Sequence, residues 1–185
     1  MQSTQNTTEA NGGDDKSSLK STDLITTRDW EPETDKNFIF ATMLKGLYYG
    51  NEWFREIEKD TFMKHYHKII ETILNYPGVT ITVACLKEDK DVILGYSVSH
   101  WLQTSSTTGL NVLDFVFVKD RWRRIGIAKT LVPKDYEAVS HLTKQGKALK
   151  PKNIPFNPFL LWFVPNANPT QIISVCITGA GSVQL

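Results

Sequence analysis

Two adjacent arginines followed by a turn of small residues are the feature of this sequence with the clearest chemistry. The run Arg123-Arg124-Ile125-Gly126-Ile127-Ala128 comes shortly after an apolar segment that ends at Val118. We expect a helix to begin here, and the first backbone N–H groups of a helix have no partners within it. Gly126 and Ala128 allow a ligand to approach that backbone. Because guanidinium groups bind phosphate oxygens in a bidentate fork, the run predicts an anion site suited to a pyrophosphate.

Two other phosphate-binding motifs do not occur in the sequence. It has no G-x-G-x-x-G dinucleotide fingerprint, and no Gly-Lys-Ser/Thr of a nucleotide P-loop. The anion site therefore rests on the arginines and the small residues after them.

The elements that would position this site follow from apolar periodicity and turn residues. We predict strands at 24–27, 79–86, 92–103, 110–118 and 159–164, and helices at 35–49, 60–75 and 125–144. Charged and polar turns join the three central strands into an antiparallel meander. The strand at 159–164 returns through the preceding helix, so a right-handed crossover should place it parallel to 110–118.

The motif and the element order resemble the GNAT superfamily of acetyl-CoA-dependent N-acetyltransferases. Its signature, Q/R-x-x-G-x-G/A after a strand, reads here as Arg123-x-x-Gly126-x-Ala128. The resemblance covers residues 23–179 and implies an α/β (α+β) fold: a mixed, mostly antiparallel sheet with one splayed parallel strand pair and flanking helices. The connection YYGNEWF is similar to that of small phage or prophage members.

The resemblance also implies an acetyl-CoA site between the two parallel strands. It places the pantetheine arm against backbone groups of Phe117 and Val118, and against Asn168. The pyrophosphate would be held by the signature segment, that is by Arg123, Arg124, Gly126, Ala128 and Lys129.

Transfer to an amine needs a base within hydrogen-bond reach of the acyl group. Asp114 is the only carboxylate on the central strand and shares a face with Val112, where some family members carry a catalytic Glu. His100 on the neighbouring strand is the second candidate. Both residues have an alternative interpretation as ordinary strand residues.

The end of the chain departs from the family pattern. Val164, Asn168, Pro169 and Gly179 keep the family spacing, but the tyrosine that usually protonates the CoA thiolate is replaced by Val175. Only six residues follow Gly179, so the final family strands are missing. We expect the apolar strand 159–164, with Trp162, Ile172 and Ile173 near it, to be covered in a homodimer.

Aromatic residues after the first helix lie where the family binds its acceptor. Tyr48, Tyr49, Trp53 and Phe54, with Glu56 and Glu58 nearby, suit a cationic amine through cation–π and charge contacts. The alternative for each aromatic residue is packing between the two helices.

Composition limits the remaining alternatives. The 185 residues carry 21 Lys+Arg and 20 Asp+Glu, so the formal charge of +1 gives no global field for nucleic acid or membrane, although Lys119 and Arg121 could extend the arginines into a local basic patch. No apolar run is long enough for a membrane span, which favours a cytoplasmic protein. Cys85 and Cys176 lie far apart in apolar surroundings, and we expect reduced thiols and no metal site.

Two functions remain for the domain expected at 23–185, which follows a tail, residues 1–22, predicted to be disordered. The first is acetyl transfer from acetyl-CoA to a primary amine by direct attack. The second is a CoA-binding interaction protein with weak or no catalysis, which the missing tyrosine and the short end favour.

Overall fold

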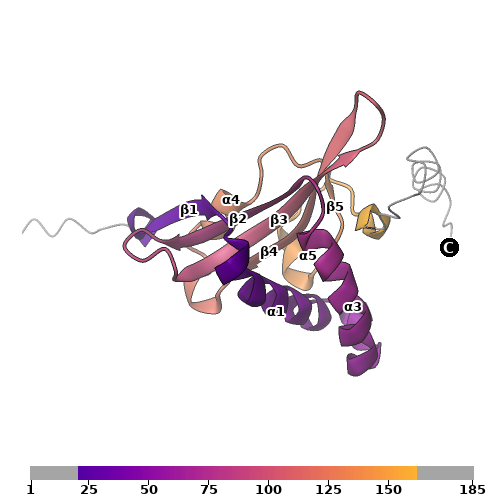
Figure 1. Cartoon of the computed structure of the whole chain (residues 1–185), viewed down its shortest axis with the longest axis horizontal. Helices are drawn as coiled ribbons and strands as arrows, with labels where there is room; N and C mark the ends of the chain where they lie inside the picture. Colours follow the sequence, from indigo (N-terminus) through magenta and orange to yellow (C-terminus); the bar gives the residue numbers. More distant parts are fainter. Residues whose placement is uncertain (1–20, 162–185) are drawn as a thin grey trace, which may run out of the picture.

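The computed structural model describes residues 21–161, and its centre is a five-stranded sheet (Figure 1). The strands lie in chain order: β1 (Ile25–Asp29), β2 (Val79–Leu86), β3 (Ile93–Gln103), β4 (Gly109–Val118) and β5 (Ala138–Val139). The first four pair antiparallel, and β5 pairs parallel with β4. The predicted architecture, a mixed and mostly antiparallel sheet with one parallel strand pair, is confirmed.

Helices cover both faces of the sheet unequally. On one face lie α1 (Pro32–Gly50) and α3 (Lys59–Leu74), joined by the short α2 (Glu52–Arg55), and on the other lies α4 (Ile127–Leu131) (Figure 1). The remaining helix, α5 (Lys144–Leu149), follows β5, and 3₁₀ turns occur at Ser21–Leu24, Asp120–Trp122 and Pro158–Leu161. Pro32 at the first helical position and the acidic Glu33 and Asp35 favour the start of α1 where they stand.

The core divides along the same two faces. Ile39 and Met43 of α1 and Phe62 and Ile70 of α3 are fully buried against the sheet, together with Tyr96 of β3. Burial of this kind contributes about 1.5–3 kcal/mol for each large apolar side chain. The α4 face has a smaller cluster around Leu94, Ile127 and Leu131.

Two predicted elements in the second half of the chain are wrong. The helix expected at 125–144 is only the five residues of α4, because Pro133 follows it. A proline disfavours helical backbone in the residue before it, and Val132 is extended with ψ 124°. The parallel partner of β4 is therefore 138–139. Residues 158–161 of the expected strand 159–164 form a 3₁₀ turn, and the rest of it lies outside the described residues.

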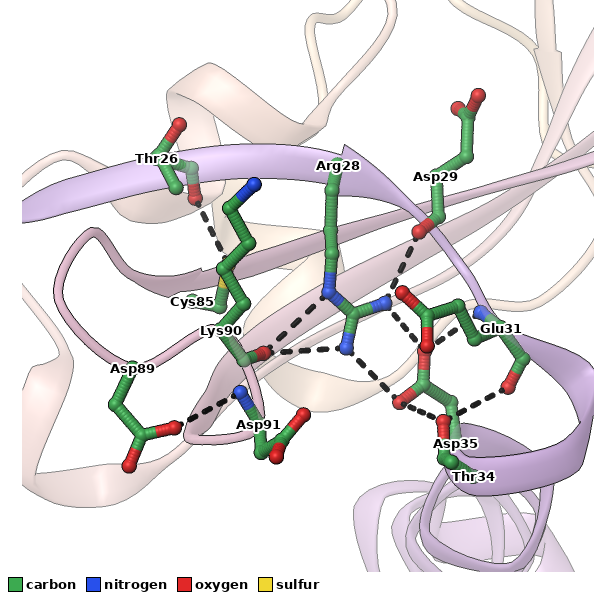
Figure 2. A network of polar contacts seen from close by, with 10 residues as sticks. All are labelled: Thr26, Arg28, Asp29, Glu31, Thr34, Asp35, Cys85, Asp89, Lys90 and Asp91. Atoms are coloured by element: carbon green, nitrogen blue, oxygen red, sulfur yellow. Dashed lines mark hydrogen bonds and ion pairs between the residues drawn. The ribbon is translucent and has the colours of Figure 1, made fainter.

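A partly buried ion pair connects the sheet to the start of α1 (Figure 2). The Arg28 guanidinium contacts both oxygens of Asp35, at 2.6 and 3.0 Å, and also donates to the Lys90 carbonyl in the β2–β3 turn. The Asp35 carboxylate also accepts a hydrogen bond from the Glu31 backbone N–H, at 2.8 Å. One carboxylate thus connects β1, the first turn of α1 and the β2–β3 turn.

Candidate active site

A β-bulge on β4 places Asp114 out of the regular alternation. Val98 of β3 pairs with Phe115, whereas the next residue, Ser99, pairs with Leu113, so Asp114 is the extra residue between two registers. A bulge bends the strand and redirects its side chain. Asp114 is buried, 1% exposed, and its carboxylate lies among polar groups of β3 and of the segment after β5.

Asp114 and His100, predicted separately as candidate bases, form one pair. Nδ1 of His100 lies 2.6 Å from Oδ2 of Asp114, and His100 is 2% exposed. Oδ1 of Asp114 accepts a hydrogen bond of 2.5 Å from the Ser140 hydroxyl. Ser140 Oγ lies in turn 3.2 Å from Nδ1 of His141. The four side chains form a continuous cluster, in which His100, Asp114 and Ser140 are buried and His141 is partly buried.

Sequence reasoning missed Ser140 and His141, because both fell inside the helix expected at 125–144. Both residues follow β5 directly, and the Ser140 N–H donates to the Leu113 carbonyl on β4, at 3.2 Å. Pro133 was the signal that would have ended the helix early and left residues after it free to form a strand.

The arrangement assigns different roles to the carboxylate and the imidazole. Both Asp114 oxygens already accept hydrogen bonds, so Asp114 is suited to orienting a neighbour. When the carboxylate is ionised it accepts from Nδ1–H of His100, which leaves Nε2 as the basic nitrogen of the neutral ring. Tyr76, which follows α3, lies edge-on to the His100 ring at 5.8 Å between centroids.

The ring of His141 lies against Ser140 and Tyr66. Its Nε2 is inaccessible to solvent, and Tyr66 of α3 lies edge-on to its ring at 6.2 Å between centroids. Burial lowers the pKa of His141 to about 4, against the smaller raising effect of the Asp114 charge. At neutral pH His141 is therefore an uncharged imidazole.

Titration of His141 should appear in the stability of the protein. In the unfolded chain its pKa is about 6.5, so the unfolded state binds a proton that the folded state does not. The free energy of unfolding should therefore fall by about 3 kcal/mol between pH 6.5 and pH 4. Urea unfolding across this range measures the slope. H141Q should lose most of it, and an unchanged slope in that variant would place its origin in another group.

Beyond Leu113, one edge of β4 has no strand partner within residues 21–161. Only Val112 and Leu113 pair with β5. In a strand, the backbone N–H and C=O groups of successive residues point to opposite edges. The Lys119 N–H donates to the Leu94 carbonyl of β3, at 2.8 Å. The backbone groups of Phe117 therefore also point toward β3, and those of Val116 and Val118 point toward the open edge. Of the two predicted pantetheine residues, Val118 has the suitable backbone direction.

The arginine loop between β4 and α4 differs from the predicted anion site in one respect. The helix after the loop, α4, has only five residues and therefore a small macrodipole. Its N-terminus contributes less to anion binding than the loop before it does. Arg124 and Gly126 both have left-handed backbone, with φ of 68° and 96°. None of the backbone N–H groups from Arg124 to Lys129 donates to a described residue. Consecutive free N–H groups around left-handed residues form an anion-binding concavity.

The basic side chains of this loop are not equivalent. Arg123 is held by the protein, since its Nε donates to the Val118 carbonyl at 3.1 Å and its Nη2 lies 2.7 Å from Asp120. Lys119 lies over the Phe38 ring, 5.0 Å from its centroid. Arg124 is exposed and makes no ion pair with a described residue, which leaves it as the guanidinium most available to a ligand.

The four predicted acceptor aromatics divide into two pairs. Tyr48 and Phe54 are buried and pack against Phe62, whereas Tyr49 and Trp53 are 57% and 69% exposed. The Asn51 side chain donates to the Leu142 carbonyl at 3.4 Å, so the junction of α1 and α2 lies beside the residue after His141. The exposed pair is therefore near the polar cluster in the fold.

The remaining predictions concern Cys85, Lys129, a metal site, a membrane span and the two ends of the chain. Cys85 is a buried free thiol, and Lys129 lines a cavity on the α4 face. Between residues 21 and 161 no three His, Cys, Asp or Glu side chains cluster as metal ligands, and none of the helices there has the length and apolarity to span a membrane. Asn168, Val175, Cys176 and the tail 1–20 lie outside the described residues.

Comparison with known proteins gives matches of structure and none of sequence. No family model and no curated protein matches the chain. A Pyrococcus furiosus protein described as a candidate acetyl transferase is 17% identical, with 87% of this chain and 94% of that chain covered and a TM-score of 0.49. An aminoglycoside acetyltransferase from an uncultured soil metagenomic sample, in complex with sisomicin, is 21% identical over 69% of this chain and 84% of its own, with a TM-score of 0.42.

A third structure is the aminoglycoside N-acetyltransferase AAC(6')-Iy in complex with CoA. It is 15% identical, covers 86% of this chain and 88% of its own, and has a TM-score of 0.36. At these identities and TM-scores, the matches say nothing of the activity or substrate of this chain.

Proposed function

We propose that the protein binds acetyl-CoA along the open edge of β4 and transfers the acetyl group to a primary amine. Three features that follow one another along the chain carry this proposal. They are the bulge at Asp114, the edge of β4 at Val116 and Val118 that no described strand covers, and the loop of N–H groups from Arg124 to Lys129. A pantetheine chain carries amides and can add to such an edge as an extra strand does.

The loop after β4 suits the pyrophosphate that follows the pantetheine arm. Six backbone N–H groups, the Arg124 guanidinium and the open space beside Gly126 lie in one short segment. A Cβ at Gly126 would meet nothing within 4 Å, but the φ of 96° disfavours any other residue. Both ligand access and backbone conformation therefore favour glycine here.

Transfer by direct attack needs only one proton acceptor from the protein. The amine nitrogen attacks the thioester carbonyl, the C–N bond forms, the C–S bond breaks and CoA leaves as a thiolate. His100, oriented by Asp114, takes the proton from the amine. Water then protonates the thiolate, a role for which the family uses the tyrosine that Val175 replaces here.

The acceptor would enter beside the junction of α1 and α2. Tyr49 and Trp53 offer exposed aromatic faces to a cationic amine, and Glu52 lies between them in sequence. The Asn51 to Leu142 hydrogen bond connects this surface to the segment that carries Ser140 and His141.

A protein that binds CoA without efficient catalysis is the second candidate, and one observation favours it. Asp114 and His100 are 1% and 2% exposed, so an acceptor nitrogen reaches them only if neighbouring side chains move. Release of CoA thiol that depends on added amine separates the two functions, because a binding module shows ligand binding without turnover.

Acetyl-CoA should stabilise the folded protein. At about 100 times its dissociation constant, mass action adds roughly 2.7 kcal/mol to the free energy of unfolding. For a chain of this size the melting temperature should rise by about 5–10 °C, as thermal denaturation would show. An unchanged melting temperature at millimolar acetyl-CoA would contradict both candidate functions.

The contribution of Arg124 to binding can be measured separately. R124N removes the guanidinium with a residue that tolerates left-handed backbone, so the fold should be preserved. Loss of a charge-assisted phosphate contact should weaken acetyl-CoA binding by about 1.5–3 kcal/mol in calorimetry. R55A, which removes an arginine from α2, is the control. Equal affinity of R124N and the wild type would move the pyrophosphate away from this loop.

A further inference from the structure

A cavity of about 830 Å³ lies on the α4 face of the sheet. Its floor is formed by Thr80 and Thr82 of β2 and Ser99 of β3, its wall by Trp101, and its rim by Lys129 and Lys134. Ser97, two residues before Ser99, donates to the Leu131 carbonyl at 2.7 Å, which fixes this face as that of α4. The cavity also borders His100, whose ring points to the opposite face with Asp114 and Tyr76.

The early end of α4 explains why the cavity exists. The helix stops at Leu131, and the segment from Val132 to Asp135, which includes a turn at residues 134–135, then passes along the cavity on its way to β5. In a helix reaching residue 144, as the sequence pattern predicts, these residues would not form this connecting segment. The sheet face below is polar, because Thr80 stands opposite Ser99 and Thr82 opposite Ser97.

The hydroxyl groups of the floor have unused hydrogen-bonding capacity. Ser99 is 4% exposed, yet its Oγ bonds to no described residue, and neither do the hydroxyls of Thr80 and Thr82. Thr80 is exposed and Thr82 is partly buried, so a ligand in the cavity can replace water as the hydrogen-bond partner of these hydroxyls. A hydroxyl both donates and accepts, and its best-matched partners are other hydroxyls. The floor therefore suits a polyhydroxylated ligand.

The rim and the wall add a charge and a flat apolar surface. Lys129 and Lys134 are exposed, and neither forms an ion pair with a described residue. The nearby Asp135 carboxylate instead accepts from the Asn111 amide at 3.2 Å. Trp101 is 53% exposed, and its ring packs on Gly109 so closely that a Cβ there would lie 2.4 Å from it. The ring is held in place with part of its surface toward the cavity.

We propose that this cavity binds a sugar phosphate. The sugar hydroxyls would pair with Thr80, Thr82 and Ser99, the sugar face would lie on Trp101, and the phosphate would lie between Lys129 and Lys134. The volume is within the range of small-molecule sites. The floor and wall of this second site lie on the face opposite to the Asp114 side chain, and Lys129 is shared with the loop proposed for the pyrophosphate of acetyl-CoA.

Titration of the full-length protein with glucose 6-phosphate tests the proposal by NMR. The indole N–H signal of Trp101 should shift and saturate at millimolar ligand, while that of Trp53, exposed beyond α1, should not move. Glucose and inorganic phosphate, each alone, should bind at least tenfold more weakly. The shifts should appear in the protein without acetyl-CoA, and also if acetyl-CoA proves not to bind at all.

Two variants and one control locate the site. T82V should weaken glucose 6-phosphate binding several-fold and K134A about tenfold, whereas K147A, on α5, should bind as the wild type does. Circular dichroism and thermal melting verify that each variant is folded. Absence of a Trp101 shift would overturn the proposal. So would inorganic phosphate binding as tightly as glucose 6-phosphate, or K134A binding as tightly as K147A.

Discussion

Turnover by D114N is expected to be about 10²- to 10⁴-fold lower than that of the wild type at neutral pH. An Asn at this position offers an NH₂ group where the His100 Nδ1 now meets a carboxylate oxygen at 2.6 Å. The ring then loses the charge that orients it and the acceptor that fixes Nε2 as the base. Amine-dependent release of CoA thiol measures the loss, and calorimetry should give an unchanged dissociation constant for acetyl-CoA.

The matched control for D114N is S140A. It removes the 2.5 Å hydrogen bond to the other carboxylate oxygen and leaves the contact with His100 intact. Its turnover should therefore fall much less than that of D114N. If both variants turn over as the wild type does, Asp114 serves the fold alone and the base lies elsewhere.

The largest expected effect on stability comes from D35A. The substitution removes the carboxylate that pairs with the Arg28 guanidinium, and the Arg28 side chain is only 12% exposed. It also removes the acceptor of the Glu31 N–H. Breaking a buried pair from one side costs about 3–5 kcal/mol. The melting temperature should fall by roughly 10 °C, on about 2–4 °C per kcal/mol. Figure 2 shows the hydrogen bonds of Asp35 that this substitution removes.

Comparison variants show whether this cost belongs to the pair. D35N keeps an acceptor for the Glu31 N–H and should lose less stability than D35A. In a double-mutant cycle with R28A, the two losses should add to more than the loss of the double variant. A cost for D35A below about 1 kcal/mol would mean that the pair behaves as a surface salt bridge.

The pH dependence of this pair differs from that of His141. Burial alone would raise the pKa of Asp35, but the hydrogen bonds from Arg28 and the Glu31 N–H outweigh it and hold the pKa below its usual value. A depressed carboxylate pKa contributes stability that is complete above the unfolded pKa, about 3.9, and is lost as pH falls below it. The two acid transitions therefore occur in separate pH ranges.

Local sequence patterns predicted the first half of the fold closely. The β-branched run at 79–86 became β2 with the same bounds, because Gly78 and a charged turn delimit it on both sides. The helix expected at 60–75 is α3, whose apolar stripe is buried. These elements are specified by residues near one another in the chain, which is the information that periodicity contains.

The second half depends on contacts between residues that are distant in the sequence. Pro133 ends α4 by a local effect that the apolar pattern obscured, and β5 exists only because two residues pair with β4. The bulge at Asp114 is a property of strand register, so neither strand reveals it alone. Asp114 and His100 were identified from residue type, whereas Ser140 required the observed pairing.

The expected dimer loses its premise for the same reason. It depended on an exposed apolar strand at 159–164, but residues 158–161 form a 3₁₀ turn and β5 lies earlier in the chain. Leu160 is instead buried against Val112 and Ala138. The argument from an uncovered strand edge therefore does not apply to this segment.

The unequal lengths of the strands give the polar cluster two halves with different local stability. His100 and Asp114 belong to the long β3–β4 hairpin, which opens only with the sheet, whereas Ser140 and His141 follow a strand of two residues. Short elements open locally at lower free energy than core strands do. Amide hydrogens of residues 138–141 should thus exchange with solvent faster than those of β3. Transient detachment of this segment exposes the His100–Asp114 pair without unfolding the scaffold that holds it.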